Sequence, residues 1–500
     1  MLTRESLPKH KQKTMKRFSI GSACLLAAIP TYRMQAQHVE QQRPNLLVVM
    51  ADQFRGDAFG FRGKEAVKTP CFDRFASQAV VFTQAVSSYP VSSPARGMFL
   101  SGAYPHVNGV LTNCQSQSAT QDVELRQDLT CWSDILKQEG YQTAYIGKWH
   151  LDKPVKPYVD CANNRGAMAW NEWCPPERRH GFDYWTAYGT YDQHLRPLYW
   201  NTDGGRQDFY YVDQWGPEYE ADLAIQYLDS IRGSDKPFAM MVSMNPPHTG
   251  YELVPERYKQ LYRDLNVDSV AASLPQLQGK PNFAQMFKRS LADYYACITG
   301  VDEQFGRIVE ALKRNGQYDH TIVVFVSDHG DSMGMHENIG KNIFYEEAVR
   351  IPFFLAYGDH IAPRMDNDLL ISIEDFCPTV LSLMGLKDRI PTTVQARDLS
   401  EQVKGSREQM PDGQLYMRYN AVNETGTNVD NGLRGFRTLT YTYAVRFKQG
   451  KVVERFLFDR KKDPSQLENI VDRHPEVADG LHARMKKRLV EINDPAAAFL

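Results

Sequence analysis

Short apolar runs that end in polar residues recur along this chain and constrain its fold more than any other feature. They cover residues 44–50, 142–147, 238–244 and 321–326, and the last is almost purely apolar and β-branched. Runs of this kind are typical of parallel strands that are buried on both faces. Helical patterns lie between them, most clearly over residues 283–315. The alternation predicts an α/β fold, a large doubly wound, mostly parallel sheet flanked by helices.

The pattern changes near residue 405, where short antiparallel strands replace the alternation of strand and helix. We expect a main α/β domain over residues 38–404 and a smaller C-terminal α+β subdomain, built on an antiparallel sheet, over residues 405–500. The predicted C-terminal strands cover residues 414–419, 433–446 and 451–459, and the predicted terminal helix covers residues 475–492.

Residues 1–37 have the composition of a secretory signal peptide. Residues 16–17 form a basic region, residues 22–30 an apolar segment and residues 34–36 a cleavage site, so Met15 is the expected start of translation. We therefore expect an exported protein, either periplasmic or secreted.

Composition excludes several classes of partner. The formal net charge of −2 at pH 7 lacks the basic excess of a nucleic-acid-binding protein. No apolar run reaches the ~18 residues that a helix needs to cross a bilayer. We expect this chain neither to bind nucleic acid nor to span a membrane.

The cysteines allow two readings. Cys24 precedes most of the apolar segment instead of following it, so cleavage of the signal peptide is favoured over a lipid anchor. Eight cysteines less Cys24 leave seven, an odd number, and at least one thiol stays unpaired. The short loop between Cys161 and Cys174 favours a disulfide there, and burial of both as small apolar side chains is the equal alternative.

Aromatic residues are concentrated between residues 158 and 215, where five of the seven tryptophans lie. One reading is an inserted segment that packs on its own large side chains, and the other is a rim that stacks on sugar rings. The two readings are compatible. The candidate substrate-binding residues of this segment are Trp173, Arg178, His194 and Arg196.

Two polar pairs follow predicted strands and form a candidate metal site. Asp52-Gln53 comes after the first apolar run and Asp328-His329 after the last. Ligands of open α/β sheets bind at the carboxyl ends of the strands, so these pairs are expected to meet. Three oxygen-bearing side chains and one imidazole suit a hard divalent cation, and Ca²⁺ is the expected ion.

One stretch carries the main functional signal. Ser92, Pro94 and Arg96 have the spacing S-x-P-x-R, and residues 100–106 read Leu-Ser-Gly-Ala-Tyr-Pro-His. This stretch resembles the active-site signature of the type I sulfatases of the alkaline-phosphatase superfamily, here of the serine type. The resemblance implies that Ser92 is oxidised to formylglycine by a radical-type maturase, and that the hydrated aldehyde attacks sulfur.

Further motifs follow in the order of that family. Gly147-Lys148-Trp149-His150 resembles the segment whose Lys grips sulfate and whose His is catalytic. His248 ends a Pro-Pro-His segment whose His contacts the ester, and Lys341 begins a G-K-x-x-x-Y-E segment whose Lys reaches the leaving oxygen. Both metal pairs also resemble the family's, although Gln53 and His329 depart from the more frequent Asp-Asp and Asp-Asn. With Arg96, these residues form the expected catalytic set.

The expected function is removal of O-sulfate from a sulfated carbohydrate. One alternative is a phosphodiesterase or phosphonate monoester hydrolase on the same fold, which would release a phosphorus product instead of sulfate. Another is a non-catalytic glycan-binding protein in which Ser92 is never oxidised. Within the sulfatase reading, the preferred substrate is a galactose- or hexosamine-type sulfate attacked from the chain end.

Overall fold

The computed structural model describes residues 43–419 and 430–500. These described residues belong to one compact unit. The predicted signal peptide, with its start at Met15, lies outside the described residues. Within the described part, no helix combines the length and the apolar character that crossing a membrane requires.

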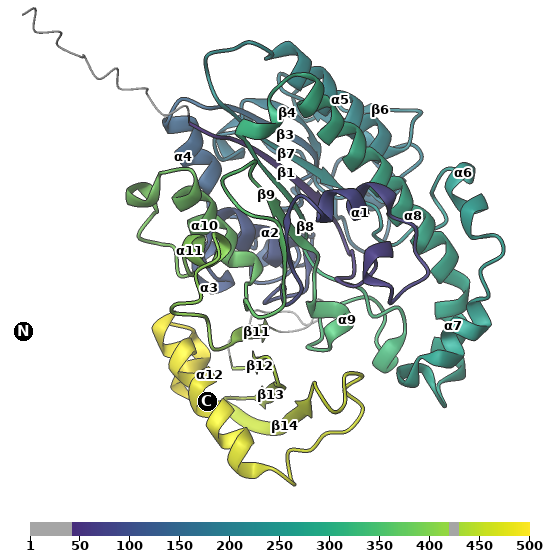
Figure 1. Cartoon of the computed structure of the whole chain (residues 1–500), viewed down its shortest axis with the longest axis vertical. Coiled ribbons are helices and arrows are strands. Elements are labelled where there is room, and N and C mark those ends of the chain that lie inside the picture. The colour runs from purple at the N-terminus through teal and green to yellow at the C-terminus, as the bar shows by residue number, and fades with distance from the viewer. Residues whose placement is uncertain (1–42, 420–429) are drawn as a thin grey trace, which may run out of the picture. The chain divides into compact units, whose positions relative to one another are not determined.

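A ten-stranded, mostly parallel sheet forms the centre of the fold, as the sequence predicts (Figure 1). Its strand order is β10-β2-β9-β8-β1-β7-β3-β4-β5-β6. The four strands predicted from apolar runs are the neighbours β8, β1, β7 and β3, and they pair in parallel. Their carboxyl ends therefore share one edge of the sheet. The strands are β1 Asn45–Ala51, β2 Val80–Phe82, β3 Gln142–Lys148, β4 Tyr184–Tyr188, β5 Leu198–Asn201, β6 Tyr210–Tyr211, β7 Phe238–Met244, β8 Thr321–Ser327, β9 Phe353–Ala356 and β10 Arg364–Asp366.

Helices cover both faces of this sheet. Since successive side chains point to opposite faces, each strand contributes apolar residues to both. In β1, Leu46, Val48 and Met50 join the apolar cluster of α2, α4 and α10, whereas Leu47 and Val49 join that of α1, α5 and α8. The long helix predicted over residues 283–315 is α8. The helices are α1 Pro70–Ala76, α2 Ser92–Ser101, α3 Pro105–Asn108, α4 Trp132–Gln138, α5 Gly216–Ser230, α6 Glu256–Lys259, α7 Val267–Ser273, α8 Pro281–Arg314, α9 Glu346–Val349, α10 Phe376–Leu383, α11 Ser400–Val403 and α12 Pro475–Glu491.

The second sheet is antiparallel, in the order β11-β12-β13-β14, and α12 packs against it. The prediction of one strand over residues 433–446 is wrong, because a tight turn divides the segment. The turn is closed by the Thr438 N–H, which donates to the carbonyl of Tyr441, and it contains none of the Gly, Pro or Asn residues that usually mark a turn. The boundary expected at residue 405 stays a prediction. The strands are β11 Gln414–Arg418, β12 Gly432–Arg437, β13 Tyr441–Lys448 and β14 Lys451–Asp459.

The aromatic-rich segment of residues 158–215 extends one edge of the large sheet through β4, β5 and β6. Some of its buried aromatic side chains, such as Tyr199 and Trp200, form an apolar cluster of their own, whereas Trp185 and Trp215 join the two cores of the large sheet. Cys161 belongs to that cluster and Cys174 to the large core, and both thiols are free. Of the two readings, the disulfide is therefore wrong and burial of both cysteines as small apolar side chains is confirmed, because the two side chains pack into different cores.

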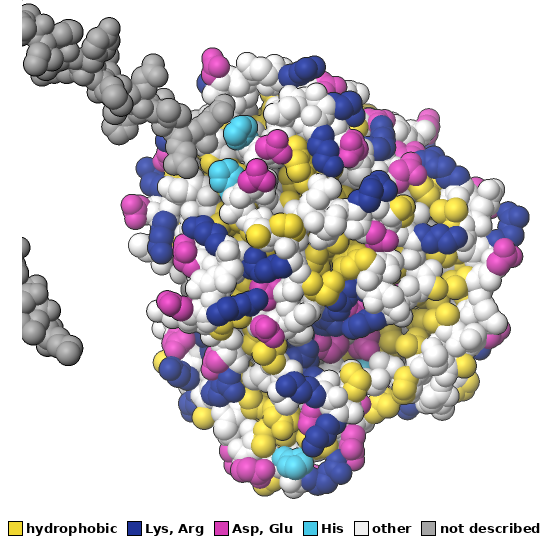
Figure 2. Space-filling model, in the orientation of Figure 1, with side chains coloured by type: hydrophobic (Ala, Val, Ile, Leu, Met, Phe, Trp, Pro, Cys, Tyr) yellow, Lys and Arg dark blue, Asp and Glu magenta, His cyan; other side chains and the backbone are white. Residues whose placement is uncertain are grey.

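Basic and acidic side chains are interspersed over the face of the molecule that Figure 2 shows. Exposed ion pairs of this kind contribute little to stability. A different pair lies beneath the second sheet, where Arg434 donates to both carboxylate oxygens of Asp494 at 2.9 and 3.0 Å and both side chains are almost fully buried. Removing one partner of such a pair leaves a buried charge without compensation.

We predict that Arg434→Ala lowers the free energy of unfolding by about 3–5 kcal/mol, measured by urea denaturation of the purified protein. The matched control is Lys404→Ala, which removes one partner of the exposed Lys404–Glu401 pair and is expected to cost less than about 1 kcal/mol. Equal losses in the two variants would contradict the prediction.

Candidate active site

The predicted site residues meet at the carboxyl edge of the four central strands. Asp52 and Gln53 follow β1, and Asp328 and His329 follow β8. Lys148 ends β3, which is separated from β1 only by β7. Residues far apart in the chain are thus brought together by strand order, in the way that parallel sheets build their sites.

Ser92 is the first residue of α2 and is almost fully buried. Its Oγ lies 3.0 Å from Nε2 of His329, 3.5 Å from Oδ1 of Asp52 and 3.5 Å from Nζ of Lys341. Ser92 also lies at the N-terminus of the ten-residue α2, where the positive end of the helix dipole favours an anion. The hydroxyl thus lies between the candidate metal ligands and a lysine.

Asp52, Asp328 and His329 fit a divalent cation. Each offers one ligand atom, these atoms all lie within 4.8 Å of one another, and the three residues are fully buried. Nδ1 of His329 is 2.8 Å from the carbonyl of Gly330, so Nδ1 carries the proton and Nε2 presents a lone pair. Gln53 is less well placed, because its Oε1 accepts a hydrogen bond from Lys341 at 2.8 Å, so metal ligation by Gln53 stays a prediction.

The two carboxyl groups differ in proton affinity. Burial raises the pKa of Asp52, but the positive charges around it, of which Lys148 contributes most, together outweigh burial and hold that pKa well below its usual range. Burial and the neighbouring Asp52 raise the pKa of Asp328 to about 7. Two acidic groups this close need a shared positive charge to be ionised together.

Arg96 supplies part of that charge. Its Nε donates to Asp328 at 3.0 Å and its Nη2 to Asp52 at 3.1 Å. Its Nη1 donates to Oγ of Ser243 at 2.7 Å and to the carbonyl of Lys148 at 2.9 Å. The guanidinium therefore joins the two carboxylates, and its predicted contact with substrate stays a prediction. Sequence reasoning missed Ser243, which lies inside an apolar strand.

Lys148 and His150 lie beside this pair. Nζ of Lys148 is 2.7 Å from Asp52 and donates to Oδ1 of Asn245 at 2.9 Å. Nε2 of His150 is 3.2 Å from the carbonyl of Cys114, so it carries the proton, while Nδ1 is buried and has no partner among the described residues. Burial and Lys148 keep the pKa of His150 well below its usual value, so the ring is neutral and Nδ1 can accept a proton.

Glycine is required at residue 147 by the backbone conformation at the end of β3. Its φ of +100° lies in the left-handed region, and a Cβ at this position would collide with the carbonyl oxygen of Ser243. Only glycine lets the end of β3 pass so close to β7 and turn Lys148 and His150 into the site.

His248 and Lys341 approach from two loops. Burial and the charge of Lys341 lower the pKa of His248 to about 4, and burial lowers the pKa of Lys341. Nδ1 of His248 lies 3.2 Å from Oδ1 of Asp192, a residue of the aromatic-rich segment that no sequence pattern marked. Both predicted residues therefore belong to the same cluster as Ser92.

Glu346, five residues after Lys341, ties this loop to the second sheet. Its carboxylate accepts hydrogen bonds from Arg437 at 2.8 and 2.9 Å and from Arg460 at 3.0 Å. These arginines lie on or just after strands of the second sheet, so that sheet holds the loop that carries Lys341. The sequence places Glu346 at the end of the G-K-x-x-x-Y-E segment but predicts no role for it.

The candidate substrate-binding residues have intramolecular partners. Arg178 donates to Asp152 at 2.6 Å, and Nε1 of Trp173 donates to the carbonyl of Gly204 at 3.1 Å. Contact of Arg178 and Trp173 with substrate stays a prediction. Among the tryptophans of this segment, Trp170 has its ring centroid 6.3 Å from that of His150.

His194 and Arg196 differ in their exposure. His194 is buried, and its Nε2 lies 3.1 Å from the carbonyl of Thr249, next to His248. Arg196 is exposed, pairs with Asp213 at 2.8 Å and lies over the ring of Tyr211. His194 thus adjoins the cluster and Arg196 faces solvent, and a role in substrate binding stays a prediction for both.

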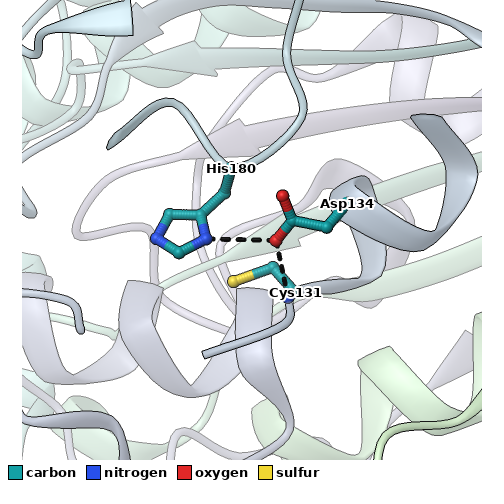
Figure 3. Close-up of side chains that lie close together, drawn as sticks. All are labelled: Cys131, Asp134 and His180. Atoms are coloured by element: carbon teal, nitrogen blue, oxygen red, sulfur yellow. Dashed lines mark hydrogen bonds and ion pairs between the residues drawn. The ribbon is translucent and has the colours of Figure 1, made fainter. Parts of the chain in front are cut away.

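Cys131, Asp134 and His180 form a second group of potential metal ligands (Figure 3). Oδ2 of Asp134 accepts from the backbone N–H of Cys131 at 2.8 Å and lies 3.1 Å from Nδ1 of His180. These contacts belong to the N-terminal cap of α4. The positive end of the helix dipole stabilises the carboxylate of Asp134 and disfavours a cation beside it. We assign the group to the start of α4.

Comparison with known proteins agrees with this geometry. The sulfatase family model matches residues 44–386, and a model described as N-sulphoglucosamine sulphohydrolase, C-terminal, matches residues 334–494. An endo-4-O-sulfatase from Bacteroides thetaiotaomicron is 38% identical over 95% of this chain and 97% of its own. An ulvan-active sulfatase from Formosa agariphila is 32% identical over 95% of this chain and 86% of its own.

A solved structure has the same fold. It is that of a proposed sulfatase from Bacteroides fragilis, 52% identical, with a TM-score of 0.88 over 93% of this chain and 99% of that one. The match covers the large sheet and the second sheet together, as the family models do. This chain therefore belongs to the sulfatase family, enzymes of the alkaline-phosphatase fold that hydrolyse sulfate esters.

Proposed function

We propose that this sulfatase removes O-sulfate from a sulfated glycan, using a formylglycine formed from Ser92 and one divalent cation, with Ca²⁺ the expected ion. The observation that carries the proposal is the position of the Ser92 Oγ, 3.0 Å from His329 and 3.5 Å from both Asp52 and Lys341. The names of the two curated relatives, an endo-4-O-sulfatase and an ulvan-active sulfatase, support a glycan substrate.

The proposed modification removes two hydrogens from Ser92, and a radical-type maturase is the partner that accepts them. A serine hydroxyl is a weak nucleophile, whereas a hydrated aldehyde offers one oxygen for attack on sulfur and a second for release of the product. A cation bound by Asp52, Asp328 and His329 would make the attacking hydroxyl more acidic and polarise the sulfate oxygens. We also propose that the protein is exported from the cytoplasm, because residues 1–37 have the composition of a signal peptide.

The remaining residues bind the anion and move protons. Lys148 and Lys341 bring positive charge to the sulfate oxygens, and such preorganised donors are worth several kcal/mol in the transition state. Nδ1 of His150 is placed to accept the proton that is lost when sulfate is released. Lys341 or His248 donates a proton to the departing sugar oxygen. Since His248 has a pKa of about 4 and is neutral near pH 7, Lys341 is the donor that we expect.

We predict that the peptide containing Ser92, from protein made with its maturase, has lost two hydrogens and reacts with an aldehyde reagent. Mass spectrometry of the digested protein measures both. Ser92→Ala must abolish the change, whereas Ser93→Ala, at the neighbouring buried serine, must retain it. An intact serine in every preparation would contradict the proposal and favour a binding protein.

Lys148→Ala and His150→Ala should each lower kcat for sulfate release by about 10²–10³-fold, as loss of a transition-state donor does. Lys153→Ala is the matched control, because Lys153 lies in the same segment and pairs with Asp122 and Glu124 instead. Ion chromatography of the products measures sulfate. Release of a phosphate monoester from diesters, with no sulfate from any sulfated glycan, would identify a phosphodiesterase instead.

Ca²⁺ added to cation-free protein should raise the melting temperature, since a ligand at 100 times its Kd stabilises the folded state by about 2.7 kcal/mol. Asp328→Asn should reduce the shift, because it removes one charged ligand. Asp134→Asn, in the second group of potential ligands, should leave it unchanged. If Asp134→Asn lost the rise in melting temperature and Asp328→Asn kept it, the cation would be assigned to the start of α4 instead.

A further inference from the structure

Asp192 contacts two residues of the active site, although it belongs to the aromatic-rich segment. Its Oδ1 lies 3.2 Å from Nδ1 of His248 and accepts a hydrogen bond from Nδ2 of Asn245 at 3.1 Å. Asn245 in turn accepts from Nζ of Lys148 at 2.9 Å. One carboxylate therefore holds His248 directly and Lys148 through an amide.

Asp192 is itself held in place. Asn163 donates to its Oδ2 at 3.0 Å and accepts from its backbone N–H at 3.3 Å. Asn245 also donates to the carbonyl of Tyr191 at 3.0 Å. These bonds join residues 158–215 to the loop after β7, so the carboxylate has little freedom to turn away from His248.

The chemistry of the contact sets the orientation of the imidazole. The carboxylate of Asp192 accepts a hydrogen bond from the Nδ1–H of His248, which directs Nε2 away from Asp192 and leaves it for the substrate. Hydrogen bonds to an ionised acceptor are about twice as strong as those between neutral groups. Burial raises the pKa of Asp192, but the adjacent His248 and Lys148 outweigh it and keep the carboxyl ionised.

We propose that Asp192 is a positioning residue of the sulfatase reaction, which orients His248 directly and Lys148 through Asn245. The inference rests on the proposed function, in which Lys148 brings positive charge to the sulfate oxygens, and on the contact of His248 with the ester that the family resemblance implies. It gives the aromatic-rich segment a part in catalysis in addition to its packing. Removal of Asp192 should affect the transition state more than the binding of substrate, because the two side chains stay present but lose their alignment.

The first experiment compares three variants by their kcat and KM for sulfate release, normalised to formylglycine content. Asp192→Ala should lower kcat by about 100-fold, the cost of a misalignment of about 1 Å, with less than a threefold change in KM. Asp192→Asn keeps the shape and can still accept a hydrogen bond, so it should lose about 10-fold. Asp160→Asn, at an exposed acidic residue of the same segment that pairs with Arg165, should behave as the parent.

A double-mutant cycle separates positioning from general stability. In a His248→Ala, Asn245→Ala background, Asp192→Ala should have no further effect on kcat, because the residues through which it acts are gone. A residual loss of about 100-fold in that background would overturn the proposal. So would a kcat in Asp192→Ala equal to that of the parent, with only the melting temperature lowered.

A crystal structure of Asp192→Ala tests the inference without turnover. The expected result is a changed side-chain rotamer of His248 and a shift of Asn245, and an unmoved pair would overturn the inference. If the parent carries formylglycine but releases no sulfate from any sulfated glycan, the proposed function fails. The structure of the variant then still decides whether Asp192 orients His248.

Discussion

Two fully buried carboxylates at the centre of the sheet require positive charge, and the rest of the site depends on how that requirement is met. Asp52 and Asp328 lie beyond the ends of the adjacent strands β1 and β8, and Arg96 donates to both. Because Arg96 is on α2, its bonds to the carboxylates fix the start of that helix against the sheet edge. Ser92 is the first residue of the same helix, so this interaction also sets the position of the Ser92 hydroxyl.

Two segments outside the central strands complete the site from different sides. The second sheet holds the loop of Lys341, through the contacts of Arg437 and Arg460 with Glu346. The aromatic-rich segment contacts His248 through Asp192. The central strands thus supply the charged centre, and the flanking segments determine where the outer lysine and histidine point.

The four central strands of the large sheet could be predicted because strands that are buried on both faces have a continuous apolar pattern. The second sheet was predicted less well, since the turn between β12 and β13 lacks the usual turn residues and Thr438 closes it by a backbone bond. For Cys161 and Cys174 the sequence left two equal readings open, a disulfide and burial as small apolar side chains. The two residues are close in the sequence, but each side chain packs into a different apolar cluster, so burial is confirmed.

Local sequence determined which chemical groups are present. These are the serine at the start of a helix, the polar pairs after the strands, and the Gly-Lys-Trp-His segment, in which only glycine fits at the first position. These follow from short-range rules of propensity and from the resemblance of the motifs. The tertiary structure alone decided which groups hold one another, such as Arg96 between two carboxylates and Asp192 against His248. Such pairs join residues from separate elements, and their contacts depend on strand order and burial, which no local pattern encodes.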